Sequence, residues 1–194
     1  MSDTVPASRQ RILDVATRLF GQHGYAATSV RAVVEGAGIT KPTLYYYFSN
    51  KRGLFLAVLE AQVARIRAIL ADVRDSSDPP SERLRTFVEL QLQQASRHVD
   101  GCRLLLEAKL PRDGDDPDVD LLSLTRESYD VLMGIFEDGR NTGAFAEDLP
   151  LMSAALGVLG TIHFHVAAVV HGATLDATNI SDATRLILQG VTRR

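Results

Sequence analysis

The sequence has one cysteine among its 194 residues, and it lacks the motifs of the common enzyme classes. A single thiol, Cys102, excludes a disulfide within the chain and a zinc finger, and it favours a reducing cytoplasm. The first ten residues lack a basic segment followed by an apolar one, so no signal peptide is indicated. A phosphate-binding loop, HExxH and GxSxG are missing, and Gly36-Ala37-Gly38 lacks the third glycine of a dinucleotide loop. We therefore do not expect an enzyme.

The charge of the chain is unevenly distributed. Up to Arg52 there are seven basic residues against three acidic ones, a net charge of +4, whereas the remaining residues carry 14 basic and 21 acidic side chains, a net charge of −7. A basic segment in an otherwise acidic chain concentrates the affinity for phosphate groups in the residues up to Arg52. The overall charge of −3 therefore does not exclude a nucleic-acid partner.

Residues 28–52, TSVRAVVEGAGITKPTLYYYFSNKR, predict two short helices joined by a glycine-containing turn. The hydroxyls of Thr28-Ser29 can cap the first helix, whose apolar positions are Val30, Val33, Val34 and Ala37. Gly36-Ala37-Gly38 ends this helix, because glycine accepts the left-handed conformation. Thr40 is a natural N-cap for the second helix, and Pro42 suits its first turn. The pattern is typical of a helix-turn-helix.

The second of these helices is expected to present an unusual surface. Leu44 and Phe48, spaced i and i+4, enter the core. The side chains left outside are Lys41, Thr43, Tyr45, Tyr46 and Tyr47. Three consecutive tyrosines cannot share one face of a helix, since neighbours lie about 100° apart. Cations, hydroxyls and rings suit the major groove of DNA, although an ordinary amphipathic corner with solvated tyrosines is the alternative.

Thr28–Arg52, with the helix expected before it, resembles the DNA-binding domain of TetR-family transcriptional repressors. The resemblance implies an all-α chain of about nine helices, with a helix-turn-helix domain over residues 1–52 and a helical ligand-binding and dimerisation domain over residues 53–194. It also implies which residues contact DNA. These are Ser29, Arg31, Lys41, Pro42, Thr43, Tyr45, Tyr46, Tyr47 and, as a phosphate contact after the second helix, Lys51.

The apolar periodicity of the remaining sequence predicts further helices. Their expected ranges are 8–22, 51–74, a helix opened by Pro79-Pro80, 102–110, 118–140, 151–173 and 181–191. Asp78 is expected to cap the proline-led helix, and Asp100-Gly101 to end it. Leu122 is expected to point inward. The run PRDGDDPDVD, residues 111–120, is expected to be an acidic surface loop without the spacing of an EF-hand.

Residues 151–173 contain no charged side chain and are long enough to span a bilayer. We set a membrane helix aside, because His163 and His165 would lie near the bilayer centre and the flanks lack interfacial anchors. A helix that is apolar all round can instead be buried between protein layers. Together with the final helix, in which Leu186 is expected to pack, residues 151–173 predict a homodimer interface of four helices, two from each chain. The last two long helices of TetR-family proteins have this role.

A ligand pocket is usually apolar with a few directed polar groups. Seven residues of the expected carboxyl-terminal domain supply that mixture, although each taken singly also fits an ordinary core. They are Gln91, Cys102, Tyr129, Met133, Phe136, His163 and His165. From this mixture we expect a small, mostly apolar effector and no cofactor. Since His163 and His165 are two residues apart on a helix, they point to nearly opposite sides and cannot chelate one metal.

These expectations combine into a cytoplasmic, dimeric repressor that binds a pseudopalindromic operator and is released by a small molecule. Two alternatives stay open. One is a helical small-molecule-binding protein without a DNA-binding role, and the other is an enzyme that uses His163 and His165. The sequence does not identify the effector, the operator or the regulated genes, and it does not separate repression from activation.

Overall fold

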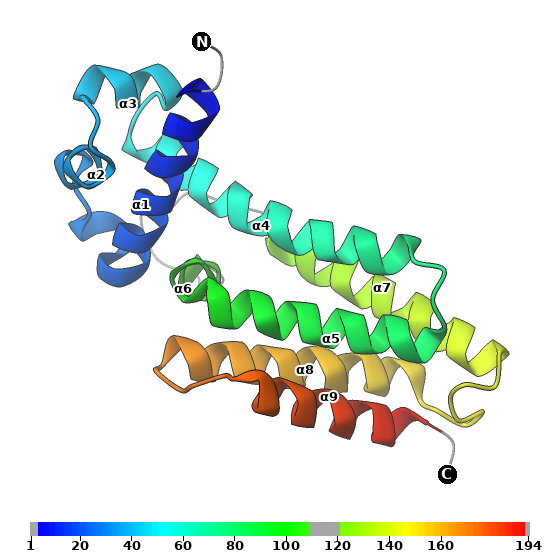
Figure 1. Cartoon of the computed structure of the whole chain (residues 1–194). Helices are drawn as coiled ribbons and strands as arrows, with labels where there is room; N and C mark the ends of the chain where they lie inside the picture. The colour runs from blue at the N-terminus through cyan, green and yellow to red at the C-terminus, as the bar shows by residue number, and fades with distance from the viewer. Residues whose placement is uncertain (1–3, 109–120, 193–194) are drawn as a thin grey trace. The chain divides into compact units, whose positions relative to one another are not determined.

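The computed structural model describes residues 4–108 and 121–192, and within these ranges it contains nine α-helices and no strand beyond an isolated Phe145–Thr192 bridge (Figure 1). The predicted all-α class is confirmed. The chain divides into two compact units, Met1–Val63 with Asp100–Val119 and Ala64–Val99 with Asp120–Arg194. The first unit thus extends beyond residue 52 into the fourth helix. The acidic segment expected over residues 111–120 lies outside the described residues.

The first unit is built around an aromatic centre. Its helices are α1 (Thr4–Ala27), α2 (Val30–Ala37), α3 (Lys41–Tyr47), the first part of α4 (Lys51–Asp75) and most of α6 (Val99–Ala108). The buried rings of Phe20 and Phe55 lie edge to face, with centroids 5.0 Å apart, and Tyr25 stacks on Phe20 and meets Phe55 edge to face. Such ring pairs stabilise a small core beyond their buried area. This centre joins α1 to α4.

Helix α1 is longer than the predicted range 8–22 because it continues through a kink. Gly24 has φ 77° and ψ 169°, a conformation that is essentially restricted to glycine. The buried Thr28 hydroxyl donates to the carbonyls of Leu19 and Gly24, at 3.0 and 2.9 Å. These two bonds connect Thr28 to the last turns of α1. The kink turns the last residues of α1 toward the start of α2.

The second unit is a bundle of long helices. Its members are the last part of α4, α5 (Pro80–Arg97), α7 (Leu121–Asn141), α8 (Leu151–Val170) and α9 (Ala177–Val191). Helix α5 packs against α7, α8 and α9 with the predicted stripe that includes Leu84, Phe87, Val88 and Leu92, which is fully buried. In Figure 1, α5, α8 and α9 run side by side. An Arg67–Glu127 fork, with contacts of 2.7 and 2.9 Å, ties α4 to α7.

Two predicted helix boundaries are wrong. Asp78 does not cap α5, because its carboxylate accepts the Ser76 hydroxyl at 2.9 Å and α5 has no side-chain cap. The break expected at Asp100-Gly101 lies instead at His98, the residue after α5, and α6 begins at Val99. Gly101 stays helical, and the buried Gln62 side chain lies directly against its Cα. This glycine permits close packing and does not end a helix.

One predicted orientation is also wrong. Leu122 is 84% exposed, because α7 buries Leu121 and Leu124 and the position after Leu121 is turned about 100° away. Leu186 on α9 is exposed as well. Helix α9 begins four residues earlier than expected, since Asp176 and Asn179 form a reciprocal capping box with contacts of 2.9 and 3.2 Å. The capping box therefore fixes the residue at which α9 begins.

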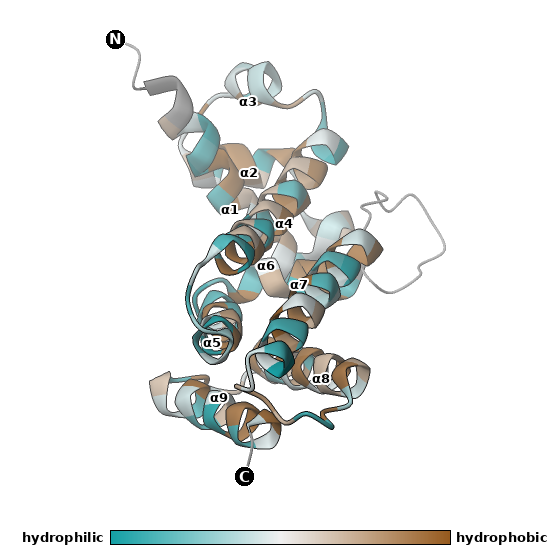
Figure 2. Cartoon of the chain, turned by 90° about the vertical axis from the view of Figure 1, so that its right-hand side faces the viewer, coloured by the Kyte–Doolittle hydropathy of each residue, from teal (hydrophilic) through white to brown (hydrophobic). Residues whose placement is uncertain are grey.

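Helix α8 is apolar on more than one side, as its mainly brown and white ribbon shows in Figure 2. Its length and composition alone would allow it to cross a membrane, a test that core helices of soluble proteins also pass. Only 28% of its most apolar window is buried inside the chain. Most of this window is therefore not covered by the chain itself.

Candidate nucleic-acid interface

The turn between α2 and α3 is built as predicted. The Ser29 hydroxyl accepts the backbone N–H of Ala32 at 3.1 Å and thereby caps α2. Gly38 follows α2 with φ 62° and ψ 40°, the left-handed conformation, and its N–H donates to the Glu35 carbonyl at 3.2 Å. Val33 and Ala37 are buried. The glycine therefore ends α2 and lets the chain turn into α3.

Helix α3 is short and capped at its start. The Thr40 hydroxyl accepts the Thr43 N–H at 3.4 Å, and Pro42 lies in the first turn, where no N–H is needed. Leu44 is completely buried and Phe48, which follows the helix, is nearly so, as predicted. These two side chains fix which face of α3 is turned outward.

The outward face of α3 carries a cation and two phenol rings. Tyr46 is 78% exposed, and Tyr45 and Lys41 are exposed beside it. Thr43 and Tyr47 are half-buried instead of exposed; the Thr43 hydroxyl pairs with Thr40 at 2.8 Å, and the Tyr47 ring lies edge to face with Tyr46 at 5.0 Å. Exposed phenols beside a lysine suit a polyanion with apolar base edges.

Helix α2 adds a second cation to this surface. Arg31 Nε donates to Glu35 Oε1 at 2.7 Å, and both side chains are exposed. This bond raises the pKa of Arg31 and leaves the two terminal amino groups without a partner among the described residues. Such an orientation presents the outer edge of the guanidinium to solvent, the edge that pairs with phosphate or guanine.

Lys51 differs from the other cations expected to contact DNA. Its Nζ donates to the Ala26 carbonyl at 3.2 Å and lies 4.4 Å from the Tyr25 ring centroid. The side chain is half-buried, and this burial lowers its pKa. Arg52, the next residue, is exposed. Sequence reasoning missed the contact with α1, because residues 25 positions apart give no periodic signal.

The residues expected to bind a ligand are spread over both units. Cys102 lies on α6 in the first unit; burial raises the pKa of its thiol to about 11, so the thiol is protonated at neutral pH. The other six lie in the second unit. Phe136 is completely buried with its ring centroid 5.7 Å from that of Phe145, which indicates a core role. Half-buried positions are Gln91, Tyr129 and Met133, whereas His163 is exposed.

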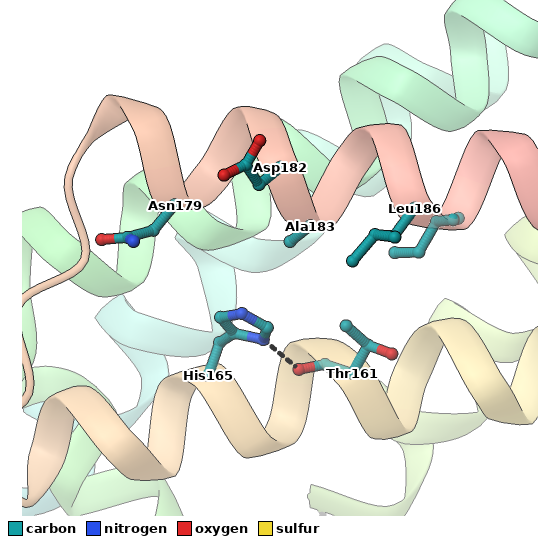
Figure 3. Close-up of a pocket in the computed structure, with 7 residues that line it drawn as sticks. Thr161, His165, Asn179, Asp182, Ala183 and Leu186 are labelled. Atoms are coloured by element: carbon teal, nitrogen blue, oxygen red, sulfur yellow. Dashed lines mark hydrogen bonds between the residues drawn. The ribbon is translucent and has the colours of Figure 1, made fainter.

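His165 lines a hollow of about 390 Å³ between α8 and α9 (Figure 3). The hollow is also lined by Thr161, Asn179, Asp182, Ala183, Leu186 and Ile187. The imidazole Nδ1 lies 2.8 Å from the Thr161 carbonyl, which can only accept, so Nδ1 carries the proton. Across the described residues, no group of three or more His, Cys, Asp or Glu side chains is arranged to hold a metal ion.

Two capped helices joined by a tight turn, the second with an exposed recognition surface, define a helix-turn-helix DNA-binding protein. Residues 12–58 match the family model described as bacterial regulatory proteins, tetR family. The helix-turn-helix region of this chain is thus that of the TetR family of regulatory proteins.

Named relatives agree with this assignment. The chain is 52% identical to the HTH-type transcriptional repressor ComR of Escherichia coli over 60 residues, which are 31% of this chain and 29% of ComR. It is 27% identical to the HTH-type transcriptional regulator RutR of Escherichia coli over 205 aligned positions, covering 100% of this chain and 94% of RutR. The match to ComR thus spans less than a third of that protein, and the match to RutR nearly all of it.

A solved structure extends the likeness to the whole fold. The ketosteroid transcriptional regulator KstR2 of Mycobacterium tuberculosis aligns with a TM-score of 0.75 at 22% identity, over 96% of this chain and 95% of that one. At this level of identity the alignment supports the arrangement of the helices and does not transfer a ligand.

Proposed function

We propose that this protein is a cytoplasmic transcriptional repressor that binds a pseudopalindromic operator as a homodimer and is released from it by a small molecule. The observation that carries the proposal is the outward face of α3, where Lys41, Tyr45 and Tyr46 are exposed while Leu44 is fully buried. A helix that fits the major groove needs such a division between an anchored and a reading face.

The roles of the exposed groups follow from their chemistry. The ammonium of Lys41 and the phenol of Tyr45 supply hydrogen bonds to phosphates, and the ring of Tyr46 offers an apolar edge to thymine methyl groups. Arg31, held at its Nε by Glu35, presents its terminal amino groups from α2. We assign the remaining expected contacts, Ser29 and the α3 residues Pro42, Thr43 and Tyr47, to the edge of the same surface.

The dimer follows from the apolar surface of α8 and α9. Three exposed residues of α8, Met152, Leu156 and Phe164, are spaced by four and eight positions and therefore share one side of the helix. Leu186 is exposed on α9. Monomeric soluble proteins rarely expose such a patch, and a two-fold axis would cover it with the same patch of a second chain.

The glycines of α8 support a second copy as the occupant. A Cβ added at Gly157 or Gly160 would meet nothing within 4 Å, so packing inside the chain does not require these glycines. A missing side chain lets the backbone of a facing helix approach closely. The hollow beside His165 lies on the same two helices, and Phe164, the residue before His165, is exposed, so this part of the chain offers both a recess and a projecting ring.

A dimer places two α3 helices on one duplex. Recognition helices of such dimers enter major grooves about 34 Å apart, one turn of B-DNA, or a multiple of it. The α4 helix begins directly after the α3 corner in the first unit and ends in the second. A ligand that shifts this helix changes the separation of the two reading helices and weakens binding to both half-sites together.

The contacts of α4 inside the second unit give this coupling a physical path. The Arg67 guanidinium forms three hydrogen bonds with Glu127 on α7. Arg83 on α5 donates to the Val73 carbonyl on α4 at 3.2 Å and to Asp138 on α7 at 2.7 Å. A small, mostly apolar effector that displaces α7, beside the half-buried Tyr129 and Met133, would therefore move α4. Typical couplings of this kind amount to about 1–3 kcal/mol.

Binding of the variants Lys41→Ala and Tyr46→Ala to DNA tests the proposal. The probe is a fluorescent duplex enriched from a randomised pool by the wild-type protein, and affinity is read by anisotropy at several salt concentrations. We expect each variant to bind about tenfold more weakly with an unchanged melting temperature, since both side chains are exposed.

The matched control is Arg126→Ala, which removes an exposed cation from α7 in the second unit and should leave affinity unchanged. Failure of the wild-type protein to enrich any duplex at low salt would instead favour a helical small-molecule-binding protein. Equal affinity of folded Tyr46→Ala and wild-type protein would remove α3 as the reading helix.

A further inference from the structure

We propose that Arg9 of α1 contacts a DNA phosphate beside the major groove that α3 enters, so that the DNA-binding surface extends beyond the helix-turn-helix. The proposal rests on the proposed operator binding and names a further residue of the same surface. Its test therefore includes an outcome that separates the failure of the one from the failure of the other.

The first observation is a contact between the start of α1 and the end of α3 (Figure 1). The guanidinium carbon of Arg9 lies over the Phe48 ring, 5.5 Å from its centroid. Phe48 directly follows α3, is 5% exposed, and donates its backbone N–H to the Leu44 carbonyl at 2.9 Å. The ring is therefore fixed relative to α3, and Arg9 lies at the carboxyl end of that helix.

This stacking leaves the hydrogen-bond donors of Arg9 available. A guanidinium that packs its face on a ring keeps its N–H groups at the edge, where they can bond a phosphate. Arg9 is exposed, and within residues 4–108 and 121–192 no carboxylate pairs with it. Asp14, the only acidic residue of α1, accepts a hydrogen bond from Gln10 at 2.8 Å. The charge of Arg9 is thus oriented and not neutralised.

Further cations lie close in sequence to the carboxyl end of α3. Lys51 and Arg52, at the start of α4, follow Phe48 by three and four residues, and Arg52 is exposed. In the described part of the chain up to Arg52, the acidic residues are Asp14 and Glu35, and Glu35 is held in an ion pair on α2. Cations of α1 and α4 therefore gather at this end with little acidic charge to offset them.

The place of Arg9 favours a phosphate over a base as its partner. In helix-turn-helix complexes the amino-terminal residues of the recognition helix contact base edges, and in homeodomains the carboxyl end of that helix contacts the backbone. Arg9 lies at the second of these two ends. Phosphate contacts fix the position and orientation of a protein on the duplex without reading its sequence. We therefore expect Arg9 to raise affinity for all operator sequences alike.

The salt dependence of operator binding measures this contact. Each phosphate contact contributes about 0.9 to the slope of log affinity against log salt on duplex DNA. On the duplex enriched by the wild-type protein, we expect Arg9→Gln to make the slope shallower by about 0.9 for each bound subunit and to lower affinity about tenfold. Arg9→Lys keeps the charge and loses the planar contact with Phe48, so the slope should stay unchanged while affinity falls about threefold.

Arg18→Gln is the matched control, because Arg18 is also an exposed arginine of α1. It lies nine residues after Arg9, which is about 13 Å along the helix axis and two and a half turns, and thus on the opposite side of the helix. We expect its slope and affinity to equal those of the wild-type protein. Melting temperatures of all variants identify any that fail to fold, and binding is measured well below them.

Replacing single phosphates locates the partner of Arg9. Each phosphate in and beside the half-sites of the enriched duplex is exchanged in turn for an uncharged methylphosphonate, and the binding of wild-type and Arg9→Gln proteins is compared. We expect one position in each half-site at which the exchange weakens the wild-type protein about fivefold and leaves Arg9→Gln almost unaffected. Such a coupling between one side chain and one phosphate is not produced by a general loss of stability.

An unchanged slope for Arg9→Gln, with or without a lowered melting temperature, would overturn the proposal. Equal losses of slope in Arg9→Gln and Arg18→Gln would also overturn it, and so would methylphosphonate effects that are the same in wild-type and Arg9→Gln proteins at every position. If the wild-type protein enriches no duplex, the proposed function fails, and this proposal with it, before any variant is compared. The two failures are therefore distinguishable.

Discussion

Tyr46 in the first unit and Phe164 in the second are almost equally exposed, at 78% and 77%, yet their surroundings differ. Tyr46 is a phenol beside Tyr45 and Lys41, whereas Phe164 has no polar atom in its side chain and lies on α8 with other exposed apolar residues. Phenols beside a lysine suit DNA, which is charged and hydrated, and a ring among apolar residues suits an apolar protein surface. The chemistry of an exposed side chain thus indicates the kind of partner it meets.

The largest effect is expected where a charge enters the proposed dimer interface. Phe164→Asp would bury an uncompensated carboxylate against a second copy, so we expect a monomer by analytical ultracentrifugation and loss of measurable operator binding. Leu122→Asp is the matched control, since Leu122 is 84% exposed on α7 and apolar as well. A Phe164→Asp protein that remains a dimer would place the interface elsewhere.

A smaller effect is expected at glycines, which the two units use differently. Gly24→Ala forces a side chain into the conformation at φ 77°, so we expect thermal unfolding to show a loss of about 1–3 kcal/mol in the free energy of unfolding. Gly160→Ala on α8 meets no neighbour in the chain and favours the helix by up to about 1 kcal/mol, but should weaken the dimer. A Gly160→Ala dimer of unchanged affinity would show that no partner helix approaches there.

The smallest effects are expected when a hydroxyl is removed from Tyr46 or added to Phe164. Tyr46→Phe keeps the ring that is assigned to thymine methyl groups and removes only its hydroxyl, so it should weaken operator binding by about threefold at most. Phe164→Tyr adds a hydroxyl at the edge of the apolar interface and should shift only the dimerisation constant. Binding isotherms and sedimentation profiles of both variants measure this. If Tyr46→Phe altered the dimerisation constant, the two surfaces would not be separable.

The first unit follows signals that are local in sequence. Ser29 and Thr40 cap their helices, Gly38 adopts the left-handed conformation, and Leu44 is buried, as their spacing predicts. Each of these features depends on residues within one or two helical turns. The helix-turn-helix could therefore be predicted almost completely from the sequence.

Features that depend on distant residues could not be predicted in this way. Gly101 has the sequence character of a helix end, but the Gln62 side chain from α4 packs on it and the helix continues. Lys51 is held by Tyr25 and Ala26, which no periodicity connects to it. Leu186 is apolar and yet exposed, and the proposed dimer would cover it with a second chain. Contacts between distant helices and between copies leave no fixed spacing in the sequence.

Enrichment of a randomised duplex pool by the wild-type protein, followed by sequencing, tests the central claim most directly. A dimer with two reading α3 helices predicts an inverted repeat whose half-sites are centred about one helical turn, 10–10.5 base pairs, apart or at a multiple of that spacing. Enrichment of no sequence, or of a single asymmetric site without a repeated half, would contradict the account.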